Sequence, residues 1–219
     1  MAVLEGGVSA ALAGVGAEAG SALHVVNKPI PYGTLGHYRT SVRINSTAAQ
    51  AANSRIFEIR NTHATNLIIP TRLTVLALQT AAGTAQENSL DIYRCTSFSV
   101  VDTTNTVTPV SSVKRTSMAA YPGGAAVRHL TLAGNAAGMT GGTLTKDTQF
   151  FATLPYNVAA AIATTFMWGP LDALDDVNGS HPFVFIQNEG LIIENRVLNV
   201  TSYGITWYID FAWAEVTAF

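Results

Sequence analysis

The chain has 219 residues and a formal net charge of −2, from 12 Lys and Arg residues against 14 Asp and Glu residues. No basic cluster exists that would neutralise a phosphate backbone, which argues against nucleic-acid binding. Charged residues make up only 12% of the chain, roughly half the fraction typical of soluble domains, and this deficit predicts that other subunits cover much of the surface. A surface of Thr, Ser, Asn and Gln is the alternative.

Residues 1–35 differ in composition from the rest of the chain. An Ala/Val background is interrupted by Gly6, Gly7, Gly14, Gly16 and Gly20, and Pro29 and Pro31 follow. Glycine at this density opposes a helix, and proline favours extended chain. We predict an extended N-terminal arm over residues 1–35 that orders on a neighbouring subunit, with an unstructured terminus as the alternative. Without a basic leader, the stretch is also a poor signal peptide.

From residue 36 onward, apolar residues with period two predict short strands separated by turns. The predicted strands are "GHYRTSVRI", "SRIFEIRN", "LIIPTRLTVLALQT", "SLDIYRCTSFSVV", "AAVRHLTLA", "TQFFATL", "PFVFIQ", "GLIIENRV" and "YGITWYIDFAWAEV". Pro70 predicts an edge or a bulge in the third of these. About eight to ten short strands predict an all-β fold, an antiparallel, jelly-roll-like β-sandwich over residues 36–219. Residues 111–120 and 157–168 leave a helical alternative open.

The C-terminal strand raises a question about its second face. Ile205, Trp207, Ile209, Phe211 and Trp213 occupy every second position and predict a core face. Tyr208 and Asp210 lie on the other face, which has no Lys or Arg. A carboxylate there needs a donor, and the arginines to consider on adjacent strands or subunits are Arg39, Arg60, Arg72, Arg128 and Arg196. We expect this face to meet a second sheet or a symmetry mate.

Motifs for catalysis or metal binding are weak. The five histidines are far apart without a metal-ligand spacing, and no nucleophile elbow or phosphate-binding loop occurs. The segment "DALDDVNGSHP" gathers Asp172, Asp175 and Asp176, which suit either calcium or a turn. Cys95 is the only cysteine, and we predict a buried, inert thiol. Glu194 and Glu215 are read as solvent-facing. We predict no enzyme, no cofactor and no metal site.

Several stretches carry a resemblance to a known group of proteins. They are "LGHYR" at 35–39, "SRIFEIRNTHATNLIIPTRLTV" at 54–75 and "HPFVFIQNEGLIIENRV" at 181–197, followed by a closing strand that ends "FAWAEV". Together they resemble the structural proteins of tailed bacteriophages, which run from a small-residue N-terminus through "GHYR" to a closing aromatic strand. The resemblance implies a virion component with a β-sandwich fold. Glu194 departs from the arginine that this pattern has after "GLII".

These observations lead to an expected function in assembly. We expect a bacteriophage capsid decoration or cement protein, located in the virion, that forms a homotrimer and binds the major capsid protein, without a nucleic-acid or membrane partner. A tail, baseplate or fibre protein is the first alternative. A sugar-binding, lectin-like module with an exposed Tyr121 or Trp168 is the second. The residues expected at assembly contacts are Val3, Leu4, Val8, Leu12, Val25, Val26, Ile30, Tyr32, Tyr208 and Asp210.

Overall fold

The computed structural model describes residues 3–6, 11–14, 35–47, 49–109, 113–114, 124–131, 136–161, 165–168, 183–199 and 204–217. The chain divides into two compact units, Met1–Pro31 and Tyr32–Phe219. In the first unit, β1 (Val3–Gly6) pairs antiparallel with β2 (Ala11–Gly14). The predicted arm over residues 1–35 therefore contains a strand pair, and its role on a neighbour stays a prediction.

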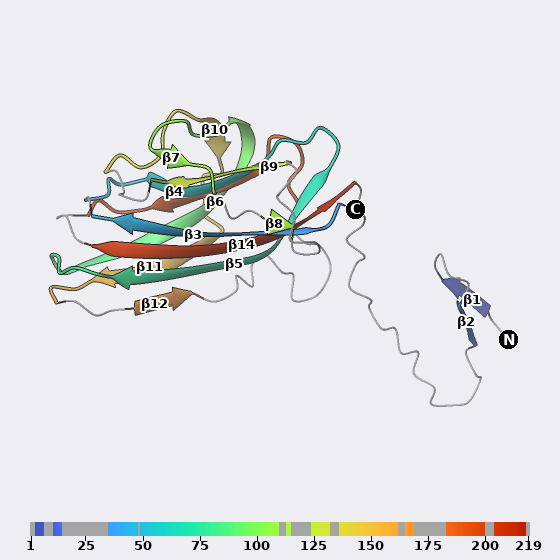
Figure 1. The fold of residues 1–219 in the computed structure, drawn as a ribbon, viewed down its shortest axis with the longest axis horizontal. Coiled ribbons are helices and arrows are strands. Elements are labelled where there is room, and N and C mark those ends of the chain that lie inside the picture. Colours follow the sequence, from blue (N-terminus) through green and yellow to red (C-terminus); the bar gives the residue numbers. More distant parts are fainter. Residues whose placement is uncertain are drawn as a thin grey trace. The chain divides into compact units, whose positions relative to one another are not determined.

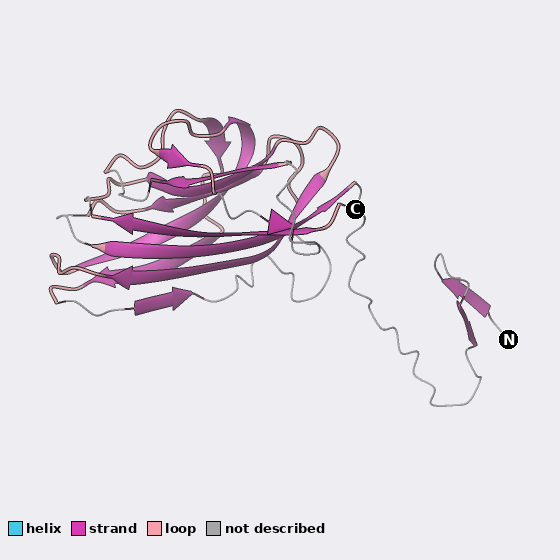
Figure 2. Ribbon diagram, in the orientation of Figure 1, coloured by secondary structure: helices cyan, strands magenta, loops and turns pink. Residues whose placement is uncertain are grey.

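The second unit is built from strands, and none of its described residues is helical (Figure 2). The strands are β3 (His37–Ser46), β4 (Ser54–Asn61), β5 (Leu67–Gln79), β6 (Gln86–Val100), β7 (Thr106–Val107), β8 (Val113–Lys114), β9 (Ala125–Leu130), β10 (Thr143–Lys146), β11 (Ala152–Val158), β12 (Thr165–Trp168), β13 (Gly190–Asn195) and β14 (Ile205–Val216). The described residues include no helix that is long and apolar enough to cross a membrane.

These strands form two antiparallel sheets that pack face to face (Figure 1). The five-stranded sheet has the order β12-β5-β14-β3-β8. The seven-stranded sheet has the order β10-β6-β13-β4-β9-β7, and β11 also pairs with β6. The rings of Phe57 on β4 and Phe211 on β14 lie 6.0 Å apart across the interior, and Trp207 and Trp213 are fully buried in the same core. The predicted all-β antiparallel sandwich is confirmed.

The pairing of the main strands is nested. The first strand of the sandwich pairs with the last, since β3 pairs with β14. Moving inward along the chain, β4 pairs with β13, β5 with β12 and β6 with β11. Two further pairings, β5 with β14 and β6 with β13, join these strand pairs into the two sheets. The strands β7 to β10 lie in the long connection between β6 and β11.

The interior side of each sheet follows from period-two alternation. Along β3, Tyr38, Val42 and Ile44 are buried while the residues between them, such as Arg39 and Arg43, are exposed. Each buried aliphatic side chain of this size contributes about 1.5–3 kcal/mol by leaving water. The alternation along β3 thus places its polar side chains on the outer face of the five-stranded sheet.

Several predicted elements differ from the observed ones. "PFVFIQ" is not a strand, because Phe185 makes only an isolated bridge with Ile68 before the chain turns at Asn188, whose φ is 63°. The strand predicted at "TQFFATL" begins later, at Ala152. The helical alternatives are wrong for the described residues, since Val113–Lys114 is β8 and Thr165–Trp168 is β12.

Pro70 marks the irregularity that its residue type predicted. Arg72 lies opposite Ala212, whereas the next pair joins Pro70 to Trp213, so β5 has one extra residue at this point. A bulge relieves the missing N–H of proline by breaking the ladder where the donor would be needed. The prediction of a bulge is confirmed.

Candidate functional site

The outer face of the five-stranded sheet carries a mixed polar and apolar surface, which we call the arginine face. Its residues come from three neighbouring strands: Arg39, Ser41, Arg43 and Asn45 on β3, Thr206, Tyr208, Asp210 and Ala212 on β14, and Arg72, Thr74, Leu76 and Leu78 on β5. The register places Tyr208 between Arg43 and Leu76. Tyr208 is 36% exposed, which is unusual for a large ring at the centre of a sheet.

Asp210 finds its partner on the adjacent strand. Arg39 donates two hydrogen bonds to the Asp210 carboxylate, at 2.6 Å from Nε and 2.8 Å from Nη2. Ser41 adds a third, from Oγ at 2.7 Å. The prediction of an arginine on a neighbouring strand is confirmed, and Arg39 was among the five candidates. Arginines on β3 and β5 therefore supply the positive charge that β14 itself lacks.

Two other arginines on this face have no carboxylate partner among the described residues. The Arg43 guanidinium lies 5.7 Å from the centroid of the Tyr208 ring, and its Nε donates to Asn45 at 3.2 Å. Arg72 donates from Nε to the Thr74 hydroxyl at 3.2 Å. Within the described ranges, no ion pair forms at either guanidinium. Uncompensated arginines beside an exposed tyrosine are typical of protein interfaces.

The other residues expected at assembly contacts are placed only in part. Val3 and Leu4 lie in β1, and Leu12 lies in β2. Val8, Val25, Val26, Ile30 and Tyr32 lie outside the described residues. The same holds for the aspartates at 172–176 and for Tyr121, while Trp168 ends β12. Their roles in assembly, calcium binding or sugar binding stay predictions.

The outer side of the seven-stranded sheet contains a buried pair of acids. The backbone N–H of Asp102 donates to Glu58 Oε1 at 2.7 Å. Asp102 Oδ1 accepts from the backbone of Gly142 at 2.7 Å and pairs with Arg55 at 2.9 Å. Burial, followed by the nearby Asp102 carboxylate, raises the pKa of Glu58 to about 8. Glu58 is therefore protonated at neutral pH. The hydrogen bond between Asp102 and Glu58 holds the chain that follows β6 against β4.

Glu58 and Asp102 do not form a catalytic acid pair. Both residues are fully buried, and a glycosidase needs its two carboxyl groups open to the substrate. Glu58 Oε2 and Asp102 Oδ2 have no hydrogen-bond partner within the described part of the chain. A proton held between these two oxygens would satisfy both, as in other buried carboxyl pairs. The arrangement is thus structural.

Glu194 is buried, so its prediction as solvent-facing is wrong. It is only 5% exposed and forms an ion pair with Lys146 of β10. The Lys146 ammonium also lies 4.0 Å from the centroid of the Tyr93 ring. Burial raises the pKa of Glu194, and the hydrogen bond from Lys146 opposes that rise. No local pattern could reveal this pair, because Lys146 is far away in the sequence.

Glu215 is the second acid whose predicted exposure is wrong. It is 2% exposed and accepts a hydrogen bond from Trp213 Nε1 at 3.2 Å. His63 Nε2 lies 3.6 Å from its other carboxylate oxygen. Glu215 follows Trp213 by two residues, so period-two alternation places it on the core side of β14, and the solvent-facing prediction failed because it followed the charge of the residue instead of the pattern.

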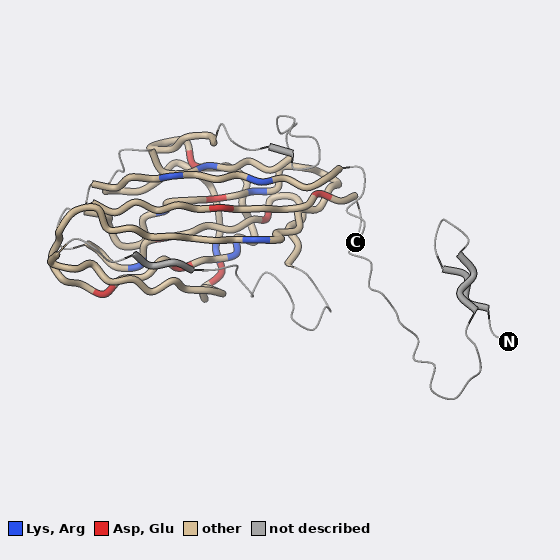
Figure 3. The backbone as a smooth tube through the Cα atoms, turned by 60° about the horizontal axis from the view of Figure 1, so that its bottom comes forward, with Lys and Arg blue, Asp and Glu red and all other residues tan. Residues whose placement is uncertain are grey.

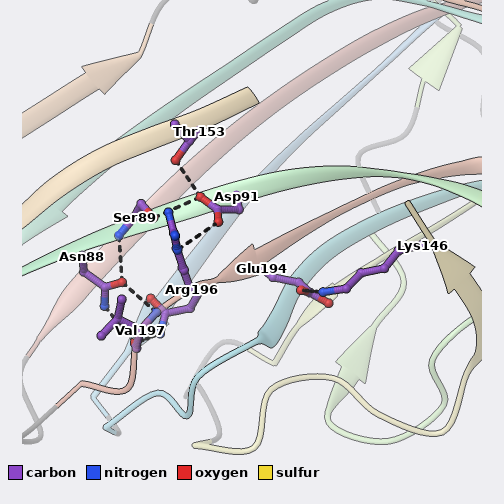
Figure 4. A network of polar contacts seen from close by, with 9 residues as sticks. Asn88, Ser89, Asp91, Lys146, Thr153, Glu194, Arg196 and Val197 are labelled. Carbon is purple, nitrogen blue, oxygen red and sulfur yellow. Dashed lines mark hydrogen bonds and ion pairs between the residues drawn. The ribbon is translucent and has the colours of Figure 1, made fainter. Parts of the chain in front are cut away.

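A pocket of about 430 Å³ opens beside β6 and β11. Its lining residues are Glu87, Asn88, Ser89, Thr153, Pro155, Arg196 and Val197. Asp91 lies between three of them (Figure 4). Its Oδ1 accepts from Ser89 Oγ at 3.0 Å and from Thr153 Oγ1 at 2.6 Å, and Arg196 Nε lies 3.7 Å from its Oδ2. Sequence reasoning missed this pocket, because strand pairing assembles it from three separate segments.

No metal site emerges from the described residues, which contain no group of three or more His, Cys, Asp or Glu side chains placed to bind an ion. Cys95 is fully buried, and burial is the main cause that raises the pKa of its thiol to about 12. The prediction of a buried thiol is confirmed, and the raised pKa disfavours the reactive thiolate.

No family model, curated protein or solved structure matches this chain.

Proposed function

We propose that the protein is a bacteriophage virion structural protein, namely a capsid decoration or cement protein that assembles with itself as a homotrimer and with the major capsid protein. The arginine face carries this proposal. It exposes Tyr208 at the centre of a sheet, next to the half-buried Leu76 and Leu78. Tyrosine and arginine anchors surrounded by apolar surface are the residues that contribute most to binding at protein interfaces.

The charge content of the chain supports the same role. Only 12% of the residues are charged, and several of the acids are buried in pairs on the opposite sheet. Little charge therefore remains to keep the exposed faces in water. Figure 3 shows how few positions along the described strands are charged. Contacts between subunits would cover this surface, and repeated copies favour closed symmetric contacts of this kind.

The nested strand order supports the jelly-roll part of the proposal. A jelly roll is a long hairpin folded into two sheets, in which the first strand pairs with the eighth and the second with the seventh. The pairs β3–β14, β4–β13, β5–β12 and β6–β11 follow this order. The jelly roll is a fold that viral capsid proteins use. The N-terminal unit would reach a neighbouring subunit by strand addition.

The mass of the full chain in solution tests self-assembly. Sedimentation equilibrium should give a trimer for the natural chain and a monomer for the double variant Arg43→Ala, Tyr208→Ala. Ile186→Ala is the matched control, because Ile186 is an exposed apolar residue outside the arginine face, and it should remain trimeric. A natural chain that sediments as a monomer contradicts the proposal.

Particle binding tests the arm and the location. A variant without residues 1–30 should bind phage particles more weakly than the full chain, and full affinity would contradict a role for the arm. Negative-stain images of particles that carry a tagged copy separate the shell from the tail, baseplate or fibre, which is the first alternative location.

A sugar-binding role is the second candidate function. The pocket beside β6 and β11 favours it, because its volume of about 430 Å³ lies in the range of small-ligand sites. Tyr121 and Trp168, the residues first considered for such a role, do not line it. Binding to a glycan array by the natural chain tests this candidate separately from self-assembly.

A further inference from the structure

We propose that the pocket beside β6 and β11 binds a neutral saccharide through a hydroxyl group that bridges Arg196 and Asp91. This inference develops the second candidate function and is independent of assembly through the arginine face. It names the class of ligand, the residues that hold it and the one contact on which affinity should depend. Figure 4 shows the side chains concerned.

Only one of the two oxygens of the Asp91 carboxylate accepts a hydrogen bond from the described residues. The residue is 1% exposed, and Ser89 and Thr153 both donate to its Oδ1. Its Oδ2 has no hydrogen-bond partner within the described residues. Its ion-pair partner, Arg196 Nε, is 3.7 Å away, which is longer than a hydrogen bond. A buried carboxylate oxygen without a donor is costly, so a donor arriving from the pocket would be bound favourably.

Arg196 is placed to cover this carboxylate and to move aside. Its backbone N–H donates to Ser89 O at 2.9 Å, which fixes where the side chain begins. The side chain is 56% exposed, and its guanidinium lies 5.6 Å from the centroid of the Phe150 ring. A small outward shift would admit a hydroxyl oxygen at about 2.8 Å from both Arg196 and Asp91, the ordinary length of such hydrogen bonds.

The charges around the pocket select against ions. Glu87 and Arg196 line the pocket, and Asp91 lies 3.7 Å from Arg196. Arg196 repels a cation, whereas the two carboxylates repel an anion. A hydroxyl group can accept from a guanidinium and donate to a carboxylate at the same time, so a neutral polyol uses both charges. Pro155 and Val197 add exposed apolar surface, which suits the C–H faces of a sugar ring. These features together indicate a saccharide.

The wall that carries Val197 is held in place before a ligand binds. Asn88 Oδ1 accepts from the backbone N–H of Val197 at 3.1 Å, and Asn88 Nδ2 donates to the Val197 carbonyl at 3.1 Å. Asn88 itself is buried. A wall fixed in this way lowers the ordering cost of binding, and it leaves Arg196 as the part of the pocket that moves.

Binding by the full chain tests the inference. We would probe the chain with a glycan array and, by saturation-transfer NMR, with glucose, galactose and N-acetylglucosamine. Arg196→Gln should weaken the binding of any saccharide hit by about tenfold or more, the loss of one hydrogen bond to a charged group. Thr153→Val should also weaken it, because Thr153 orients Asp91. Arg128→Gln removes a half-buried arginine of β9, outside both the pocket and the arginine face, and should leave binding unchanged.

Several outcomes would overturn the inference. One is that no saccharide in the array or the NMR series binds the natural chain. Another is that Arg196→Gln, with an unchanged circular-dichroism spectrum, binds as tightly as the natural chain. Binding of inorganic phosphate that Arg196→Gln abolishes, or of calcium that Arg196→Gln strengthens, would assign the pocket to an ion instead.

Loss of trimer formation in Arg43→Ala, Tyr208→Ala with saccharide binding intact would separate the two proposals.

Discussion

The two outer faces of the sandwich use the same kinds of charged residue in opposite ways. On the five-stranded sheet, the ion pair of Arg39 and Asp210 lies on an open surface. On the seven-stranded sheet, Asp102 and Glu194 are buried with Arg55 and Lys146 as their partners. Both faces belong to antiparallel sheets with one side in the same core, so the strand pattern does not distinguish them.

The difference lies in what covers each face. Outside the seven-stranded sheet, Val101 and Leu144 pack against Ile192, Cys95 and Phe98 in a second apolar cluster. These covering residues come from the connection between β6 and β11. An exposed ion pair contributes about 0–1 kcal/mol, whereas removing one partner of a buried pair costs about 3–5 kcal/mol. The charged residues outside the seven-stranded sheet should therefore matter for stability. Those on the five-stranded sheet should matter for contacts with other chains.

Removing Asp102, which is fully buried, is the strongest test of this comparison. Asp102→Ala should lower the free energy of unfolding by about 3–5 kcal/mol, because Arg55 and the Gly142 N–H both lose their acceptor. Urea denaturation followed by tryptophan fluorescence measures the loss. A change below about 1 kcal/mol, as expected for an exposed pair, would show that the two faces are equivalent.

Glu58→Gln isolates the pH dependence of the buried acid pair. The pKa of Glu58 is about 8 in the folded chain, against an ordinary value of 4.5. The folded state therefore binds more protons between these values, and stability falls as pH rises through that window. Gln keeps the acceptor for the Asp102 N–H and cannot ionise. We expect it to remove a loss on the order of 4 kcal/mol between about pH 5 and about pH 9.

Thermal unfolding across that pH range compares the two proteins. The melting temperature of the natural chain should drop toward alkaline pH more steeply than that of Glu58→Gln. The difference between their two curves cancels other groups that titrate in the same range, including the buried His129, whose pKa burial lowers. Parallel curves would assign the ionised form of Glu58 to the folded state at neutral pH and would contradict the raised pKa.

Lys146→Met removes the partly exposed partner of the buried Glu194. Glu194 would lose its cation but can take up a proton, since burial already raises its pKa. We therefore expect a loss of only about 1–2 kcal/mol, less than for Asp102. Chemical denaturation at neutral pH gives the value. A loss as large as that of Asp102→Ala would mean that Glu194 stays ionised without its partner.

Arg39→Met should have the smallest effect on folding. Its pair with Asp210 is open to solvent, so the free energy of unfolding should change by less than about 1 kcal/mol. Its effect should appear instead in self-association, which sedimentation velocity measures, because Arg39 belongs to the arginine face. A loss above about 2 kcal/mol, well beyond the range for surface pairs, would place the pair among the structural ones.

Local patterns predicted the sandwich and much of its core. Period-two alternation identified the inner residues of β14, and the limits of "SRIFEIRN" agree with β4, Ser54–Asn61. Pro70 predicted the bulge, and an arginine on a neighbouring strand was predicted as the partner of Asp210. Each of these depends on the residue itself or on its immediate neighbours. Short strands such as β7, β10 and β12 have too few residues to show a period, and they were missed.

The sequence by itself determined which side of a strand enters the core, because alternation along a strand sets side-chain direction. Only the tertiary structure decided what becomes of the outward side. The outward Glu194 is buried by Lys146 of β10, whereas the outward Tyr208 stays exposed. The physical reason is that cover and charge partners come from strands and loops far away in the sequence, and their arrival depends on how the whole chain pairs.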